Sequence, residues 1–336
     1  MLFRSPVIGG AILTHLSWRF MFWVNVPFCV VGILLARRYL NIDAPARPDP
    51  AAAEPKLDLP GLLLIAPGTS IVLLGLADAG TAGGFGHPDV IVPLVAGVAL
   101  LAAFTAYALR RSHPLVEIRL LARRPVGSSS AVLFFSGFSL YGAMLLLPLY
   151  YQEVRGSTAL AAGAVLVPQG IGSLLSRTVA GSNIDRFGSR VIASAGFVVV
   201  AAATVPFALA GAHTSEWQLA LWMLVRGFGL GCVTMPVMVA GYIGLDKLQI
   251  PHSSVLTRTA QQIGGSFGTA ILAVILESAV AAHPATPVDA FHVAFWWSVG
   301  FSAVAVLLSL WLPGAQPAPR GDRDGAVDRP VDPVEA

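Results

Sequence analysis

Long apolar runs alternate with short polar segments along almost the whole chain. A helix needs roughly 20 mainly apolar residues to cross the hydrocarbon core of a bilayer, because it rises about 1.5 Å per residue. Nine runs reach or approach that length, at residues 17–36, 59–77, 90–109, 126–151, 160–180, 191–211, 217–245, 255–280 and 291–312. A further run at residues 1–16 is too short for a full span. The pattern predicts an all-α polytopic membrane protein with about nine full transmembrane helices plus a half helix.

Composition agrees with a chain that lies within a membrane. Hydrophobic residues make up 55% of the 336 positions and charged residues 12%, whereas roughly 25% of a soluble domain is charged. The net charge is +3, but the basic residues lie between apolar runs and form no cluster with aromatics, which excludes a nucleic-acid-binding protein. Cys29 and Cys232 each lie inside an apolar run, which indicates small core residues rather than a disulfide or a metal site.

Motifs of common enzyme classes are missing from the sequence. It contains no His-Glu-x-x-His motif, no phosphate-binding glycine loop and no paired aspartates, and its seven histidines are scattered, mostly near the ends of the apolar runs. A membrane-embedded enzyme therefore has no candidate site. We expect neither a cofactor nor a metal ion.

The stretch 181–190 places three charges between two long apolar runs and predicts a tight loop between two membrane spans. Its spacing, Gly181-x-x-x-Asp185-Arg186-x-Gly188-x-Arg190, resembles the signature loop of the major facilitator superfamily of secondary transporters. The resemblance implies a conformational-switch loop, whose charge pairs exist in only one of two bundle arrangements. The alternative is a short charged hairpin that only fixes the topology.

Two motifs near the start resemble the antiporter branch of that superfamily. Ser5-Pro6-Val-Ile-Gly9-Gly10 is similar to its Gly-Pro-x-x-Gly-Gly helix motif, in which small residues let two helices approach closely. The string that contains Trp18, Arg19, Asn25 and Pro27 resembles the junction of the fifth and sixth helices in the fourteen-span drug:proton antiporters. This resemblance implies a chain that lacks its first four to five helices.

The same resemblance implies a domain order. It places the end of an N-terminal helix bundle at residues 1–40, a cytoplasmic linker at 41–58, a central extra helix pair at 59–111, a cytoplasmic amphipathic connector at 112–125, a C-terminal six-helix bundle at 126–312 and a disordered cytoplasmic tail at 313–336. In the connector, Leu115, Ile118, Leu121 and Ala122 recur at helical spacing. This pattern is typical of a helix on the membrane surface, and a regulatory target segment is the alternative.

The basic residues are divided unequally between the two sides of the predicted spans. Only Arg19 and Arg155 fall on one side, and the other side carries Arg37, Arg38, Arg47, Lys56, Arg110, Arg111, Arg119, Arg123, Arg124, Arg186, Arg190, Lys247 and the arginines of the tail. Because cytoplasmic loops carry the excess of Lys and Arg, the second side is predicted to be cytoplasmic. We expect a multi-pass protein of the plasma (inner) membrane, with linker 41–58 and the tail in the cytoplasm.

Arg226 lies about a third of the way into a predicted span. An arginine at the centre of a span costs about 2.5 kcal/mol or more on insertion scales, so it should face the bundle interior, a cavity or a carbonyl partner. Its role is either structural or connected with transport. With Arg226, the candidates for a cavity wall are Phe138, Tyr141, Gln169, Gln261 and Gln262, and the alternative for the aromatic members is packing or lipid contact.

The leading functional hypothesis is a secondary active transporter that exports drugs or other amphipathic small molecules by alternating access, with protons as the coupling ion. Its partners would be a small amphipathic substrate, the proton and the lipid bilayer. The alternative is a truncated, transport-inactive membrane fragment or scaffold. An in-frame upstream region with four apolar runs would favour the first hypothesis.

Overall fold

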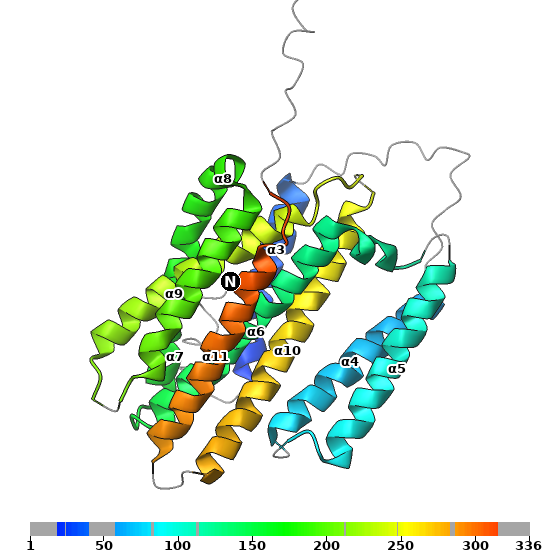
Figure 1. The fold of residues 1–336 in the computed structure, drawn as a ribbon. Helices are drawn as coiled ribbons and strands as arrows, with labels where there is room; N and C mark the ends of the chain where they lie inside the picture. The colour runs from blue at the N-terminus through cyan, green and yellow to red at the C-terminus, as the bar shows by residue number, and fades with distance from the viewer. Residues whose placement is uncertain are drawn as a thin grey trace, which may run out of the picture.

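The computed structural model describes residues 19–23, 25–39, 58–81, 84–111, 114–211, 213–246, 248–282 and 286–314, and these residues form helices joined by turns (Figure 1). The elements are α2 (Phe20–Trp23), α3 (Asn25–Tyr39), α4 (Leu59–Thr81), α5 (Pro88–Arg110), the 3-10 helix η1 (Ile118–Ala122), α6 (Arg124–Glu153), α7 (Ala159–Ala164), α8 (Leu166–Ala208), α9 (Glu216–Ala240), α10 (Ile250–Ala282) and α11 (Pro287–Ser309). The predicted all-α fold is confirmed.

Among the described residues, seven helices are long and apolar enough to cross a membrane. These spans are Leu59–Ala79, Pro88–Arg110, Arg124–Glu153, Arg186–Ala208, Glu216–Ala240, Ile250–Ala282 and Val288–Ser309. The 15 residues of α3 and the part of α8 before Arg186 are outside this set. The chain is therefore a multi-pass membrane protein, as predicted.

The stretch 181–190 is not the tight loop that the sequence predicts. It is helical up to Phe187, and the 43-residue α8 has one residue with non-helical dihedrals, Gly188, with φ 76° and ψ 160°. The helix continues past the apolar run, and its polar side chains bond to its own backbone there. Asn183 Nδ2, for example, donates to the carbonyl of Val179 at 2.8 Å. We call the part of α8 before Gly188 its first arm and the part after it its second arm.

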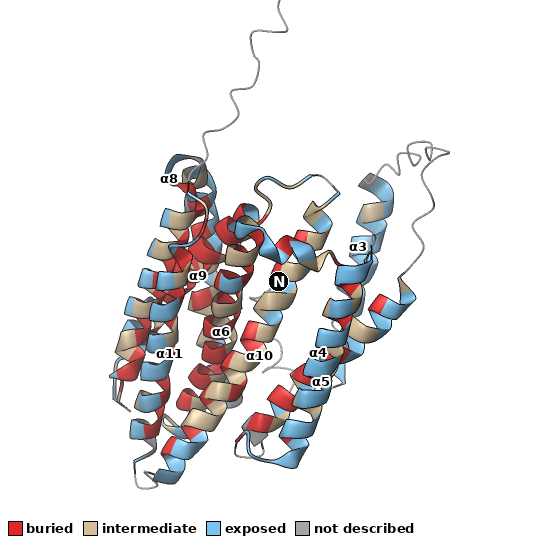
Figure 2. Ribbon diagram, turned by 45° about the vertical axis from the view of Figure 1, so that its right-hand side comes forward, coloured by how far each residue is buried: buried red, intermediate tan, exposed pale blue. Residues whose placement is uncertain are grey.

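Helices α6, α8, α9, α10 and α11 form one bundle. Helix α9 packs along both arms of α8, α10 packs along α6, and α11 packs against α8 and α6. Burial follows this arrangement, with buried residues concentrated on the inner faces of α6 and α9 and exposed ones on the outer face of α11 (Figure 2). The largest buried cluster, which includes Tyr150, Phe207, Leu219 and Phe291, joins α6, α8, α9 and α11.

The central pair α4 and α5 lies beside this bundle and is mostly exposed (Figures 1 and 2). The two helices pack against each other, and α4 also contacts α10. Val72, Leu76 and Val90 are buried together with Ala270 of α10. A second apolar cluster packs Phe104 and Ala108 of α5 near Leu256 of α10. The pair therefore contacts the bundle through two small apolar clusters and leaves most of its surface open.

The connector between α5 and α6 differs from the predicted amphipathic helix. Among residues 111 and 114–123, the described part of this connector, the regular element is the five-residue η1 and the buried side chains are Val116 and Leu120. Leu121 and Ala122 are exposed, and the position of this segment on the membrane surface stays a prediction. Helix α6 starts at Arg124, and Pro125 fits its first turn. The segment before it forms the 3-10 helix η1, in which side chains repeat every three residues instead of every 3.6.

Candidate functional site

The most deeply buried charged side chain among the described residues is Arg226 of α9, which is 1% exposed. Its Nε donates to Thr204 Oγ1 at 3.1 Å, and its Nη1 donates to Gln169 Oε1 at 3.1 Å. Its Nη2 donates to the carbonyl and the hydroxyl oxygens of Ser139, at 2.7 and 3.1 Å. The arginine therefore lies inside the bundle and has a carbonyl partner, which agrees with the cost of exposing it to lipid.

The partners of Arg226 come from three helical segments. Ser139 belongs to α6, Gln169 to the first arm of α8 and Thr204 to the second arm. The planar guanidinium group presents donors in fixed directions, so it can bind all three segments only when they hold one relative arrangement. Arg226 is thus a joint between α9 and three neighbouring segments.

The charge of Arg226 is surrounded by neutral oxygen atoms. Within the part of the chain that the structure describes, Arg155 pairs with Glu216 and His292 with Asp289, and no carboxylate is among the hydrogen-bond partners of Arg226. Hydrogen bonds to a charged group are stronger than those between neutral groups, and they offset part of the cost of burying the cation. The site therefore carries a net positive charge within the bundle.

Glycines on either side of Arg226 let α9 approach both arms of α8. A Cβ at Gly227 would overlap with the carbonyl of Gln169 on the first arm. A Cβ at Gly229 would lie 2.7 Å from the carbonyl oxygen of Gly196 on the second arm. Two residues turn a helix by about 200°, so the two glycines point to nearly opposite sides of α9. This close approach brings Gln169 and Thr204 within reach of one guanidinium group.

The predicted switch residues lie around the break in α8. Gly181 and Arg186 are exposed on the first arm, and Asp185 lies on the same helical segment. Gly188 adopts a positive φ, which an L residue with a side chain rarely adopts. Directly after it, Arg190 Nε donates to the carbonyl of Leu312 at 2.7 Å. Ser189 Oγ also donates to the carbonyl of Pro313. These two bonds attach the start of the second arm of α8 to the residues that follow α11.

The six candidate cavity residues fall into separate environments. Gln169 and Arg226 are bonded to each other in the bundle interior. Tyr141 of α6 donates to Gln262 Oε1 of α10 at 2.8 Å, and Gln261 is half-buried on the same helix. Phe138 is 2% exposed, and its ring centroid lies 4.2 Å from that of Phe301, so it is part of the core.

Two surface pockets are lined by other residues. The first, of about 440 Å³, is lined by Leu121, Arg124, Gly127, Ser128, Ala131, Leu308 and Trp311. The second, of about 280 Å³, is lined by Phe187, Val191, Ile192, Ala195, Gly196, Val199, Phe228, Gly229 and Cys232. The polar joint at Arg226 is therefore a packed site rather than an open one.

The buried arginine, the glycine-tight α8–α9 contact and the break at Gly188 occur in a chain that matches a known family over most of its length. The family model described as Major Facilitator Superfamily matches residues 4–269. The chain belongs to the major facilitator superfamily. It is a transporter-family protein and not a member of an enzyme family.

Related transporters of this superfamily carry names that refer to drug resistance. The chain is 34% identical over 275 residues to "Multidrug resistance protein B homolog" of Mycobacterium tuberculosis, an alignment that covers 81% of this chain and 50% of the relative. It is 28% identical to "Lincomycin resistance protein LmrB" of Listeria monocytogenes, with 84% of this chain and 58% of the relative covered. It is also 28% identical to "Tetracenomycin C resistance and export protein" of Streptomyces glaucescens, with 82% and 50% covered. The chain thus spans about half the length of the curated relatives that it matches.

Part of the N-terminal motifs of this facilitator protein lies outside the described residues, namely Pro6, Gly9, Gly10 and Trp18. Arg19 lies just before α2 and is exposed. Asn25 is the first residue of α3 and Pro27 follows in its first turn, where the missing N–H of proline is tolerated.

Sequence reasoning did not find Ser139 and Thr204. Small hydroxyl residues are common inside apolar helices, where they usually bond to their own backbone, as Thr204 does with the carbonyl of Val200 at 2.7 Å. Nothing in the sequence distinguishes these two positions from other serines and threonines.

Asp58 was also missed and was assigned only to a linker. Its Oδ1 accepts hydrogen bonds from the N–H of Gly61 at 3.1 Å and from the hydroxyl of Tyr107 at 2.7 Å, and its Oδ2 accepts from the N–H of Leu115 at 3.0 Å. Desolvation raises the pKa of this carboxyl, but the three hydrogen bonds and the charge of Arg111 outweigh it and hold the pKa below its ordinary value. The signal available was an aspartate directly before an apolar run, which is typical of a helix N-cap.

Proposed function

We propose that the protein is a secondary active transporter that exports drugs or other amphipathic small molecules by alternating access, with protons as the coupling ion. The observation that carries this proposal is its similarity to relatives whose names state resistance to several drugs, to lincomycin and to tetracenomycin C, the last together with export. These relatives share the family with this chain but are about twice its length.

The geometry around Arg226 supports a bundle that moves as a unit. Four helical segments meet at one guanidinium group, and backbone lies against backbone where α9 crosses both arms of α8. In alternating access, one bundle rocks against another around a central site, which requires that each bundle keep its internal packing. We assign Arg226 a positioning role in this bundle.

The break in α8 supports the proposed switch at 181–190. The chain changes direction at one glycine, and the residues directly after it attach to the end of α11 through Ser189 and Arg190. The charges of Asp185 and Arg186 lie before the break, on the first arm. We propose that these charges bind a neighbouring part of the protein in one conformation and release it in the other.

The coupling proton needs a group that titrates, and Arg226 is unsuitable because an arginine stays protonated in proteins. Its hydrogen-bond partners are neutral amide, hydroxyl and carbonyl groups. We propose that the proton is carried by a carboxylate elsewhere in the complete transporter, and that the buried positive charge of Arg226 favours the ionised form of a carboxylate that approaches it.

The proposed orientation follows the basic residues. Arg124 at the start of α6, Arg190 after the break and Arg110 at the end of α5 would lie at the cytoplasmic face of the plasma (inner) membrane. Linker 41–58 and the C-terminal tail would then also be cytoplasmic. In this orientation the turn between α8 and α9 lies outside.

The proposal can be tested with three proteins in bacteria that lack their main drug exporters. The first is residues 1–336 alone, the second is the same chain preceded by the N-terminal helices of the M. tuberculosis relative, and the third is that relative itself. Efflux of the fluorescent amphipathic cation ethidium is followed with and without a protonophore, and membrane abundance is measured in parallel. We expect protonophore-sensitive efflux from the second and third proteins and none from the first, since alternating access requires two bundles.

The same chimera carrying Asp185→Asn tests the proposed switch. It should reach the membrane in normal amounts but export ethidium more slowly. A chimera that inserts as well as the relative but exports nothing would contradict the proposal and favour the inactive scaffold.

A further inference from the structure

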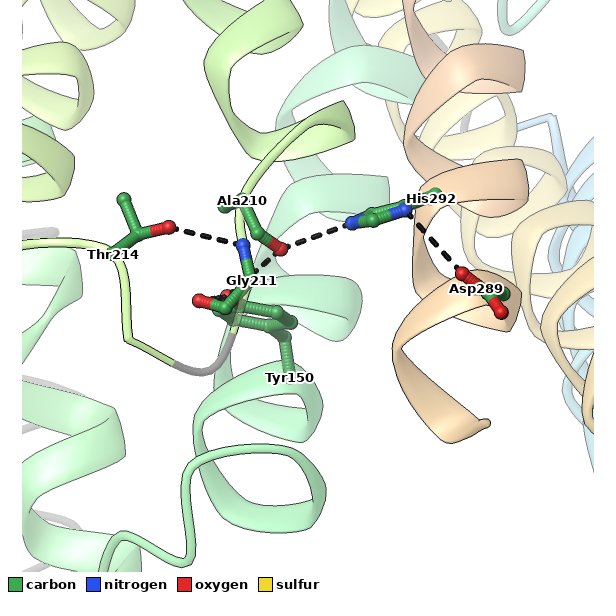
Figure 3. A network of polar contacts seen from close by, with 6 residues as sticks. All are labelled: Tyr150, Ala210, Gly211, Thr214, Asp289 and His292. Atoms are coloured by element: carbon green, nitrogen blue, oxygen red, sulfur yellow. Dashed lines mark hydrogen bonds and ion pairs between the residues drawn. The ribbon is translucent and has the colours of Figure 1, made fainter. Parts of the chain in front are cut away.

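A polar cluster joins the end of α6, the turn between α8 and α9, and the start of α11 (Figure 3). The hydroxyl of Tyr150, near the end of α6, donates to the carbonyls of Ala210 and Gly211 at 3.2 and 3.0 Å. Nε2 of His292, in the first turns of α11, lies 3.0 Å from the same Ala210 oxygen. A carbonyl oxygen can only accept, so Nε2 of His292 carries a hydrogen and donates it.

The second ring nitrogen of His292 faces a carboxylate. Its Nδ1 lies 3.9 Å from Asp289 Oδ1, one turn earlier on α11 (Figure 3). Since Nε2 already holds the hydrogen of the neutral ring, Nδ1 of a neutral His292 has only a lone pair to present to Asp289. Protonation of Nδ1 would replace this unfavourable approach with an ion pair. The side chains of His292 and Asp289 are 28% and 56% exposed and lie in the first two turns of α11.

We propose that His292 and Asp289 form a proton-binding site whose occupation tightens α11 onto the turn between α8 and α9. A proton from water adds to Nδ1, and no other bond breaks. The resulting imidazolium pairs with Asp289 across 3.9 Å on its Nδ1 side and donates to Ala210 through Nε2, and its charge strengthens both contacts. Histidine side chains in general change charge between about pH 5 and 8, and this sets the range over which the proposal is tested.

Other charged and titratable groups at this end come from the segments that surround α11. Tyr150 binds the same carbonyl and is neutral in this range. Arg155 pairs with Glu216 at 3.8 Å. Tyr151 lies under Arg155, and Glu153, His213 and Glu277 are exposed. Asp289 is therefore the charged group that the structure places against His292.

The turn between α8 and α9 depends on these contacts. Leu209 and Ala210 donate to the carbonyls of Pro206 and Phe207 over 3.4 Å each, which is long for an amide hydrogen bond. Gly211 N donates to Thr214 Oγ1 at 2.9 Å, which closes the turn (Figure 3). Because the bonds of Leu209 and Ala210 are long, the hold on the Ala210 carbonyl should determine how often this part of the turn opens.

The test is hydrogen exchange of the backbone amides at residues 209–214, measured by mass spectrometry on the full chain in lipid nanodiscs. Exchange is followed at pH 5.5, 6.5, 7.3 and 8.0, and each rate is divided by the intrinsic rate at that pH. We expect protection of this segment to rise about threefold from pH 8.0 to 5.5, the size expected of a partly exposed ion pair. No transport is needed, so the result does not depend on the proposed export function.

Three variants decide the source of the pH dependence. His292→Gln keeps a donor for Ala210 but cannot titrate in this range, so its protection should not change with pH. Asp289→Asn should reduce the rise, and His213→Gln, which alters the exposed histidine of the same turn, should leave it intact. The proposal is overturned if the wild type shows no rise, if His292→Gln or Asp289→Asn shows the full rise, or if His213→Gln abolishes it.

Discussion

Helices α9 and α5 are apolar helices of similar length that are held in opposite ways. In the apolar stretch of α9, 61% of residues are buried, against 17% in α5. Helix α9 lies between both arms of α8 and carries a buried arginine, whereas α5 packs mainly on α4 and ends near a single aspartate. Apolar composition therefore says that a helix can enter a membrane, whereas its contacts with neighbouring helices decide whether it becomes the centre of a bundle.

The largest effect should come from adding one methyl group to the centre of the bundle. In Gly227→Ala the new Cβ would overlap with the backbone of Gln169, which cannot move without separating α9 from the first arm of α8. We expect a loss of about 3 kcal/mol or more in stability and a sharp fall in the yield of monodisperse protein. Thermal unfolding after detergent extraction measures this.

Two glycine controls belong to the same experiment. Gly300→Ala on α11 has open space around the added Cβ and should be neutral or slightly stabilising. Gly97→Ala should loosen α5 from α4, because its Cβ would lie 2.7 Å from the backbone nitrogen of Val72, yet the bundle should stay folded. If Gly97→Ala is as damaging as Gly227→Ala, the contrast between the two regions is wrong.

A second, smaller effect should separate the shape of the Arg226 side chain from its charge. In Arg226→Lys, one ammonium group cannot reach Thr204, Gln169 and Ser139 together, and the buried charge is left with fewer partners. We expect a loss of about 2 kcal/mol. Arg226→Met should cost less, because it removes the buried charge together with its hydrogen bonds.

The measurement is thermal unfolding. We expect the wild type to unfold at the highest temperature, the Met variant at a lower one and the Lys variant at the lowest. Arg177→Lys is the matched control, since this arginine is exposed on the first arm of α8 and should tolerate the change. A Lys variant as stable as the wild type would show that the charge, and not the planar fork, holds the joint.

The smallest effect is expected at Asp58, which holds the exposed helix pair to the connector. Asp58→Ala should cost about 1 kcal/mol, since it removes a helix cap and the bonds to Tyr107 and Leu115. The loss should be local, with faster hydrogen exchange at the start of α4 and at residues 114–117 but not in α9. Asp246→Ala, at an exposed aspartate between α9 and α10, is the control.

The pH dependence of this contact has a definite sign. The pKa of Asp58 is lowered in the folded protein, so its contribution is complete above the unfolded value and is lost as pH falls through the folded value. Protection at the start of α4 should therefore be constant from neutral pH down to about pH 4.5 and should decline below its ordinary pKa of 3.8. A decline that begins near pH 6 would assign the effect to another group.

Sequence predicted the spans better than it predicted the site. The runs at 59–77 and 90–109 agree closely with α4 and α5, because a membrane span is decided by length and apolarity alone. The continuation of the helix from Leu166 through residues 181–187 was not recognised, since serine, asparagine and aspartate suggest a loop when their hydrogen bonds are unknown. The interior position of Arg226 followed from the cost of burying a charge, but Ser139 and Thr204 could not be found, as they are separated from Arg226 by 87 and 22 residues.

The two glycine contacts of α9 limit how this helix can move. Rotation about its own axis by one residue, or about 100°, would turn Phe228 or Leu230 toward an arm of α8 where there is room for a hydrogen atom only. Sliding along the axis would bring the same side chains against backbone atoms. Because rotation and sliding are both opposed at these two contacts, α9 should move together with the arms of α8 that it touches. A shift of α9 at one membrane face would then be passed to both arms.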